Sequence, residues 1–312
     1  MKQKFSGVVV LIFCLGFYLQ AQQNQPKITL VPVVGPVYML QGGGGNIGLV
    51  ADAVGMLMVD AMFERVAGEI REAVKTLPGG DRVRILVNTH WHSDHTDGNK
   101  ALGPGAVIIA QENVRALLAK DQTLMGGQTK ALPVDALPDV TYSDKLMAYA
   151  GGEAIRLVHF PHAHTDGDTV VFLDGLKVVH MGDMFFNGMF PFLDVANGGD
   201  IDNWVKQLDI ILGALPADTK IIPGHGPLAG VAELKAFRGM LAASADLVRK
   251  QIKTGKTLDE IKAAGVPDSL ASWANGFMKA PQWLELVYRS LEKVAGRCTR
   301  NSRSRPGTRA GS

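Results

Sequence analysis

The sequence predicts an α+β protein in which two β-sheets pack together and helices cover their outer sides. Short β-prone runs and amphipathic helical runs occur in two successive blocks, one before residue 120 and one after residue 153. Polar loops follow several of the apolar runs, as expected where strands end at the edge of a sheet. Because each such element has an apolar face to bury, the stable arrangement is a stack of sheet and helix layers around a core.

The first block begins with short strands separated by turn residues, which favours antiparallel pairing. A helix is predicted at 64–77, because apolar side chains recur at helical spacing from Val66 to Leu77 and the pattern ends at Pro78. The strands predicted in this block are 27–33, 37–41, 46–51, 55–60, 84–88 and 106–110, and a second helix is predicted at 111–120.

The second block is also rich in strands and is followed by helices. Strands are predicted at 154–160, 169–173, 177–181 and 220–223, and helices at 201–215, 231–255, 258–264 and 281–295. We therefore expect one main domain over residues 27–230 and a helical extension over residues 231–296. Residues 297–312 contain arginine, serine, glycine and proline with almost no apolar side chain, so a disordered basic tail is expected there.

The charged residues are unevenly distributed along the chain. The net charge is +2, but seven basic residues lie near the two ends without acidic neighbours. They are Lys2, Lys4, Arg297, Arg300, Arg303, Arg305 and Arg309. The rest of the chain has 25 basic and 30 acidic residues, whereas a nucleic-acid partner requires a clustered basic face. A small-molecule substrate is therefore expected rather than a nucleic acid, and the sequence favours no particular oligomeric state.

The first 21 residues have the pattern of a secretory signal peptide. Two lysines precede an apolar run over residues 7–18, and the small residue Ala21 precedes a polar stretch. The run is shorter than the roughly 20 residues that span a bilayer, which favours a removed signal over a permanent anchor. The sequence thus predicts export to the periplasm or the medium, without a membrane span in the mature chain. Cys14 leaves with the signal, so Cys298 has no partner for an internal disulfide.

Candidate metal ligands are concentrated between residues 90 and 95. In an extended segment alternate side chains point to the same side, so His90, His92 and Asp94 share one face, and a turn can bring His95 beside them. Imidazole nitrogen and carboxylate oxygen are suitable ligands for zinc and, less selectively, for iron or manganese. The segment therefore predicts a metal centre rather than a solvated polar loop.

This spacing resembles the central motif of the metallo-β-lactamase superfamily of metal-dependent hydrolases, His-x-His-x-Asp-His. Four further residues resemble the remaining motifs of that superfamily and occur in the right order along the chain: Asp60, His164, Asp183 and His225. The resemblance covers residues 27–228, and the helices beyond it resemble those of a largely uncharacterised exported branch.

The resemblance implies a four-layer αββα sandwich that binds two zinc ions at one edge, with iron or manganese as possible replacements. The implied first site consists of His90, His92 and His164, and the second of Asp94, His95 and His225, with Asp183 bridging the two. Two cations at this spacing lower the pKa of a bridging water, and the resulting hydroxide attacks a carbonyl. The implied enzyme hydrolyses a small ester, lactone, thioester or lactam.

Two aspartates and three other histidines need separate interpretation. The resemblance makes Asp94 the candidate catalytic residue, because its carboxylate could orient the hydroxide and carry a proton to the leaving atom. Asp60 is expected to support a ligand or the loop that carries it. The alternative is that Asp60 is only a turn residue at the end of a strand. His159, His162 and His180 match no ligand motif and are expected to be structural, although the spacing of His162 from the third motif leaves a ligand role open.

The substrate is predicted less sharply than the metal centre. Apolar residues in and after the metal-binding motifs predict a substrate pocket formed by Trp91, Phe185, Phe186 and Phe190. The alternative is that these rings pack inside the fold. Asp183 stands where some β-lactamases have cysteine, so other hydrolase branches are favoured over a β-lactamase. Two alternatives remain. A phosphodiesterase is disfavoured by the acidic body of the chain and by the expected export. A non-hydrolytic di-iron or metal-binding protein is disfavoured because this chain has His92 where di-iron relatives have glutamate.

Overall fold

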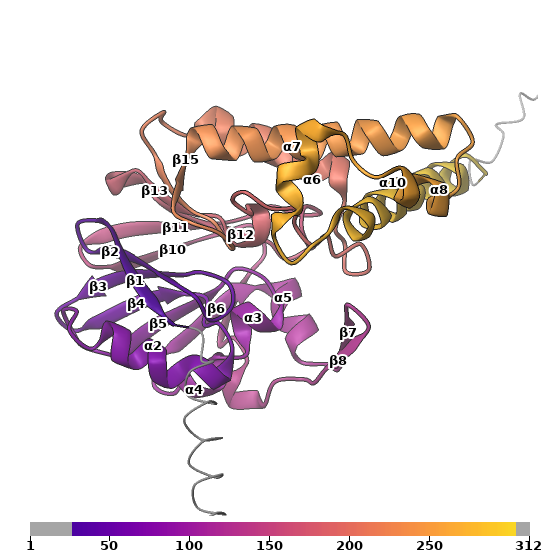
Figure 1. Cartoon of the computed structure of the whole chain (residues 1–312). Helices are drawn as coiled ribbons and strands as arrows, with labels where there is room; N and C mark the ends of the chain where they lie inside the picture. Colours follow the sequence, from indigo (N-terminus) through magenta and orange to yellow (C-terminus); the bar gives the residue numbers. More distant parts are fainter. Residues whose placement is uncertain (1–26, 304–312) are drawn as a thin grey trace, which may run out of the picture.

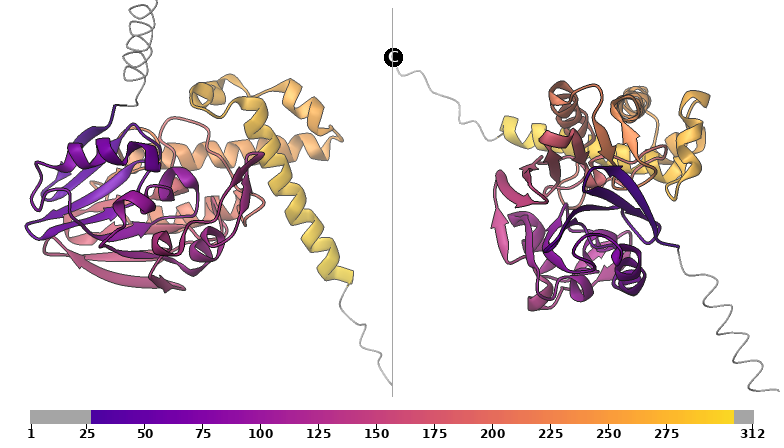
Figure 2. Two further views of the ribbon diagram at one scale, coloured as in Figure 1. Left: turned by 90° about the horizontal axis from the view of Figure 1, so that it is seen from below. Right: turned by 90° about the vertical axis from the view of Figure 1, so that its left-hand side faces the viewer.

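The computed structural model describes the backbone of residues 27–303 and the side chains as far as residue 293. Two sheets pack face to face, with helices on the outer side of each (Figure 1). In Figure 1, α2 and α4 cover the first sheet from below, while α6 and α7 cover the second sheet from above. The right-hand view of Figure 2 shows the same order of layers from the side. The predicted α+β sandwich with helices outside is therefore confirmed.

The first sheet contains seven strands in the order β1-β2-β3-β4-β5-β6-β9. The first four are antiparallel neighbours, as predicted, whereas β4, β5, β6 and β9 run parallel. The strands are β1 Thr29–Val34, β2 Val37–Gln41, β3 Ile47–Asp52, β4 Gly55–Val59, β5 Val83–Asn88, β6 Val107–Gln111 and β9 Val140–Tyr142. The helices and the small hairpin of this half are η1 Glu64–Val66, α2 Ala67–Val74, α3 Ser93–Thr96, α4 Asn99–Leu102, α5 Glu112–Leu118, β7 Gln122–Leu124, β8 Gly127–Thr129 and η2 Val134–Ala136.

The second sheet has six strands in the order β10 to β15, and only β13 and β14 pair in parallel. The strands are β10 Lys145–Ala150, β11 Glu153–His159, β12 Thr169–Leu173, β13 Val178–His180, β14 Lys220–Ile222 and β15 Ala229–Gly230. The helices of this half are η3 Asp174–Leu176, η4 Gly182–Met184, α6 Ile201–Ala214, α7 Val231–Lys253, α8 Leu258–Ala264, α9 Asp268–Ala271, η5 Ser272–Asn275 and α10 Ala280–Arg303.

The core consists of separate apolar layers because successive strand residues point to opposite faces. Leu57 and Val59 of β4 pack between the sheets against residues such as Leu157 of β11. Met56 and Met58, from the same strand, face outward to α2. The outer face of the second sheet forms one cluster with α6, α7 and α10. The helical extension is thus packed into the same core as the main domain, and this packing holds the loops between them in place.

The last helix is longer than the sequence predicted. α10 continues to Arg303, whereas a disordered tail was expected from residue 297. No proline occurs between residues 282 and 303, so none ends the helix there. Figure 2 (left) shows α10, in yellow, crossing α7 and extending past the sheets.

The predicted signal peptide, residues 1–21, and the end of the predicted tail, residues 304–312, lie outside the described part of the chain. Within residues 27–303, no helix is both long enough and apolar enough to cross a membrane.

Candidate metal centre

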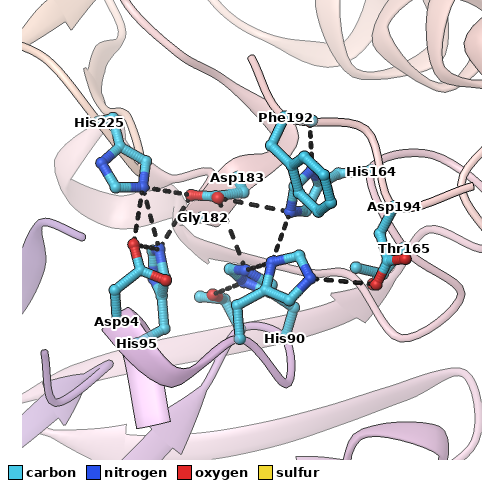
Figure 3. Close-up of polar contacts among 12 residues, drawn as sticks. His90, Asp94, His95, His164, Thr165, Gly182, Asp183, Phe192, Asp194 and His225 are labelled. Carbon is cyan, nitrogen blue, oxygen red and sulfur yellow. Dashed lines mark hydrogen bonds and ion pairs between the residues drawn. The ribbon is translucent and has the colours of Figure 1, made fainter. Parts of the chain in front are cut away.

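The predicted metal ligands come together where strands end at one edge of the sandwich (Figure 3). The loop after β5 and the short helix α3 provide the four side chains of residues 90–95, and η4 after β13 provides Asp183. His164 lies in the loop between β11 and β12, and His225 follows β14. Because β13 and β14 are parallel, their carboxyl ends meet at the same edge. Residues far apart in the sequence therefore converge.

The side chains form two adjacent groups, in each of which one potential ligand atom per residue lies within 4.8 Å of the others. The first group consists of His90, His92, His164 and Asp183, and the second of Asp94, His95 and His225. All seven predicted metal ligands thus lie in one cluster, which is divided into two groups.

The Asp183 carboxylate lies between the two groups. Its Oδ2 is 3.6 Å from Nε2 of His90 and 3.4 Å from Nε2 of His164. Its Oδ1 is 3.0 Å from Nε2 of His95 and 3.4 Å from Nε2 of His225. Oδ1 is buried and, although two imidazole nitrogens lie near it, forms no well-aligned hydrogen bond with any described residue. A buried carboxylate oxygen without a hydrogen bond is costly, and cations in the two groups would satisfy it, so this donor set fits metal ions.

Two glycines allow the backbone to approach the cluster closely. A β-carbon at Gly45 would overlap the imidazole ring of His95, and a β-carbon at Gly224 would overlap the Asp183 carboxylate. The space around both ligands is therefore kept free by residues without side chains.

Three imidazoles are oriented so that Nε2 faces the cluster, because Nδ1 is engaged elsewhere. Nδ1 of His164 donates to the carbonyl oxygen of Phe192 at 2.9 Å. Nδ1 of His90 lies 3.0 Å from the hydroxyl of Thr89, and Nδ1 of His95 lies 2.7 Å from Oδ2 of Asp60. Each engaged Nδ1 fixes its ring so that Nε2 remains available to a metal.

Asp60 supports both a candidate ligand and the loop that carries it. Besides its contact with His95, its carboxylate accepts hydrogen bonds from the backbone nitrogen and the hydroxyl of Thr89, each at 2.7 Å. The Asp60 backbone has φ +66°, a conformation that aspartate tolerates better than most residues. The structure therefore places Asp60 in the supporting position expected for it.

His92 faces the cluster with its other nitrogen. Its Nδ1 lies 3.0 Å from Nε2 of both His90 and His164, whereas its Nε2 lies 3.1 Å from Oδ2 of Asp194. The indole nitrogen of Trp91 donates to the same Asp194 oxygen at 3.1 Å. Sequence reasoning missed Asp194, because it belongs to no ligand pattern and follows a run of apolar residues.

The structure predicts that Asp194→Ala weakens binding at the first group by about 10-fold to 100-fold, since His92 would lose the partner that fixes its ring. Competition with a chromogenic zinc chelator measures this affinity. Asp218→Ala, which removes an exposed carboxylate paired with Lys177, is the matched control. Equal zinc affinity in the two variants would show that Asp194 has no positioning role.

In the metal-free protein, the histidines of the cluster differ in their pKa values. Burial lowers the pKa of His225, but the negative charges of Asp183 and Asp94 have the larger, opposite effect and raise the pKa to about 9. Burial dominates for His164 and lowers its pKa to about 4. His225 is thus protonated at neutral pH, and a cation must displace that proton in order to bind. Metal affinity should therefore fall as the pH decreases below 9.

The other three histidines have structural contacts. Nε2 of His180 lies 3.1 Å from the carbonyl oxygen of Asn46, and its Nδ1 accepts from the backbone nitrogen of Gly182. Nε2 of His159 lies 2.9 Å from the backbone oxygen of Asp166. His162 is half exposed, and its Nδ1 lies 2.9 Å from the Asp166 carboxylate. Within the described residues none of the three belongs to either group of ligand atoms.

The predicted substrate pocket is not found where the sequence placed it. Trp91 is 1% exposed, and Phe185, Phe186 and Phe190 are 0% exposed, so they present no surface to a substrate. The helical extension explains the burial of the phenylalanines: Phe190 stacks on Trp283 of α10, and Phe185 packs against Phe237 of α7. Trp91 is buried in a separate cluster with Val114 and Leu118 of α5. These aromatic rings pack inside the fold, which is the alternative that the sequence had left open.

Comparisons with known proteins agree with this architecture. The sequence model described as the metallo-beta-lactamase superfamily matches residues 40–252, which include both groups of candidate ligands. An uncharacterized protein of Aquifex aeolicus is 28% identical over 215 residues, covering 67% of this chain and 94% of that protein. The hydroxyacylglutathione hydrolase of Nitrosococcus oceani is 27% identical over 153 residues, covering 47% of this chain and 49% of that enzyme.

A solved structure extends the similarity beyond the main domain. The stereoselective inverting sec-alkylsulfatase Pisa1 from Pseudomonas sp. is similar with a TM-score of 0.63 and 16% sequence identity. The match covers 84% of this chain and 50% of that one. At this level of identity the likeness shows a shared fold.

Proposed function

The chain belongs to the metallo-β-lactamase superfamily of metal-dependent hydrolases, and on this basis we propose that it is a dinuclear zinc enzyme that hydrolyses a small ester, lactone, thioester or lactam. One observation carries the proposal. The two oxygens of Asp183 face different groups of candidate ligands, and each group has enough nitrogen and oxygen donors for its own cation. This arrangement supports two metal ions rather than one.

The first cation would be held by three imidazoles and the second by two imidazoles and Asp94, with Asp183 shared between them. Imidazole and carboxylate ligands without cysteine suit zinc and also admit iron or manganese. When bound, such a pair of cations polarises a substrate carbonyl and makes water ionise near neutral pH.

Asp94 is the candidate catalytic residue. Its Oδ2 lies 3.2 Å from Nε2 of His225, and 26% of its side chain is exposed, more than for the other two aspartates of the centre. Burial raises the pKa of Asp94, but the neighbouring His95 and His225 lower it more, to about 2. The carboxylate is therefore ionised at neutral pH, which is the form that a metal ligand requires and the form in which it could orient the attacking water.

Several features favour an acyl substrate over a phosphodiester. Among the described residues, the carboxylates of the centre form ion pairs only with histidines, so no lysine or arginine is held beside them. The body of the chain is acidic, which disfavours a polyanionic substrate. The name of the Nitrosococcus relative, hydroxyacylglutathione hydrolase, also supports the acyl class.

The proposal is tested by initial rates of the zinc-loaded chain on a p-nitrophenyl ester, a thioester, a lactone, a chromogenic cephalosporin and bis-p-nitrophenyl phosphate. We expect turnover of at least one acyl compound, reduced by about 10²-fold to 10⁴-fold in Asp94→Ala. Turnover of the phosphodiester alone, or full acyl activity in Asp94→Ala, would contradict the proposal.

We also propose that the chain is exported, on the basis of the charged, apolar and small-residue pattern of residues 1–21. The mass of the protein recovered from the periplasm or the medium tests this, since cleavage after Ala21 removes a defined set of residues. An intact chain found in the cytoplasm would overturn it.

A further inference from the structure

We propose that the helical extension provides an apolar binding surface for the acyl group of the substrate, with Phe277 as its main residue. The inference rests on the proposed function, because it specifies which substrates the metal centre receives.

The first argument is the position of Phe277 beside the open side of the centre. Phe277 lies in the loop between η5 and α10. Its ring centroid is 6.2 Å from that of His225 and 6.3 Å from that of Phe186. The His225 side chain is 18% exposed, whereas most imidazoles of the centre are almost fully buried. A substrate that reaches the centre from this side would pass next to Phe277.

The second argument is that Phe277 is exposed although its loop is well anchored. Phe277 is 51% exposed, whereas the adjacent Met278 is 2% exposed. The backbone nitrogen of Phe190 donates to the carbonyl oxygen of Trp273 at 2.7 Å, which ties η5, directly before the loop, to the segment after Asp183. The loop thus leaves about half of the Phe277 side chain in water, where it contributes no hydrophobic stabilisation. A bound apolar group would cover it.

The third argument is the apolar character of the opposite side of the centre. Phe192 is partly exposed, and its ring lies 5.5 Å from that of His92. The same ring lies 6.1 Å from that of His164 (Figure 3). Aromatic rings therefore lie next to both groups of candidate ligands. With no lysine or arginine paired to the carboxylates of the centre in the described chain, these surfaces favour an alkyl or aryl acyl group over a charged one.

The test compares p-nitrophenyl acetate and octanoate as substrates of the zinc-loaded wild type, Phe277→Ala and Phe277→Leu. In Phe277→Ala, kcat/KM for the octanoate should fall about tenfold while that for the acetate changes less than about twofold, since only the longer acyl group reaches the ring. Phe277→Leu keeps an apolar side chain and should retain most of the preference. Ile210→Ala, which shortens an exposed apolar residue on α6, is the control.

Equal losses on both esters, or an unchanged ratio in Phe277→Ala, would overturn the inference. Binding of octanoate to the zinc-loaded chain, measured by calorimetry, separates this inference from the proposed function. If none of the acyl compounds is hydrolysed, the proposed function fails, whereas octanoate binding that is weakened in Phe277→Ala still supports the apolar surface. Absence of octanoate binding to the wild type would refute it.

Discussion

Asp183→Asn is expected to lower kcat/KM by about three powers of ten or more, because the shared carboxylate supplies the charge that holds two cations together. Asparagine has nearly the same shape but one neutral oxygen and one nitrogen that donates hydrogen bonds. Both Asp183 oxygens lie within 3.6 Å of imidazole nitrogens. In either orientation, the amide nitrogen of asparagine would therefore face imidazole nitrogens instead of binding a cation. One cation would therefore be lost or displaced.

Initial rates on the best acyl substrate measure this effect. Asp174→Asn changes an exposed carboxylate that pairs with Arg156 and serves as the matched control. Circular dichroism of Asp183→Asn establishes that the fold is retained. A variant that is folded and retains more than about a tenth of the wild-type rate would contradict a shared role for Asp183.

Removal of metal by a chelator is expected to abolish hydrolysis and to lower the melting temperature by roughly 5–10 °C. A ligand present at 100 times its Kd stabilises the folded state by about 2.7 kcal/mol, and each kcal/mol corresponds to about 2–4 °C in a chain of this size. The Asp183 carboxylate would again have only imidazole nitrogens beside it. Added zinc should restore both the rate and the melting temperature.

The stabilisation by metal should also depend on pH in a defined direction. In the metal-free protein the pKa of His225 is raised to about 9, so protons compete with the cation at lower pH. The difference in melting temperature between metal-loaded and metal-free protein should therefore shrink as the pH is lowered from 9 toward 6, at a fixed metal concentration. Scanning calorimetry over this range measures the difference. A difference that grows at lower pH, or no difference at any pH, would contradict the account.

Local sequence patterns were sufficient for much of the fold. The strands at 37–41 and 169–173 and the helix at 258–264 have the predicted bounds, because turn residues or a helix cap mark their ends. β9 and β10 were missed. Both are edge strands with several exposed side chains, so they lack the continuous apolar run that identified the central strands.

The candidate ligands were predictable for a different reason. His90, His92, Asp94 and His95 lie within six residues, so their spacing alone indicates a metal centre. The supporting contact of Asp194 and the exposed position of Phe277 depend on how distant segments pack, and a single sequence does not show this. The aromatic residues after Asp183 were misplaced because composition does not distinguish a pocket wall from a core covered by later helices.

The central claim of two cations sharing Asp183 is tested most directly by the zinc content of the purified chain, measured by atomic emission and divided by protein concentration. We predict two zinc ions per wild-type chain and one per chain of His225→Ala, which loses a donor from only the second group. A single ion in the wild type, or the same content in both proteins, would contradict the claim.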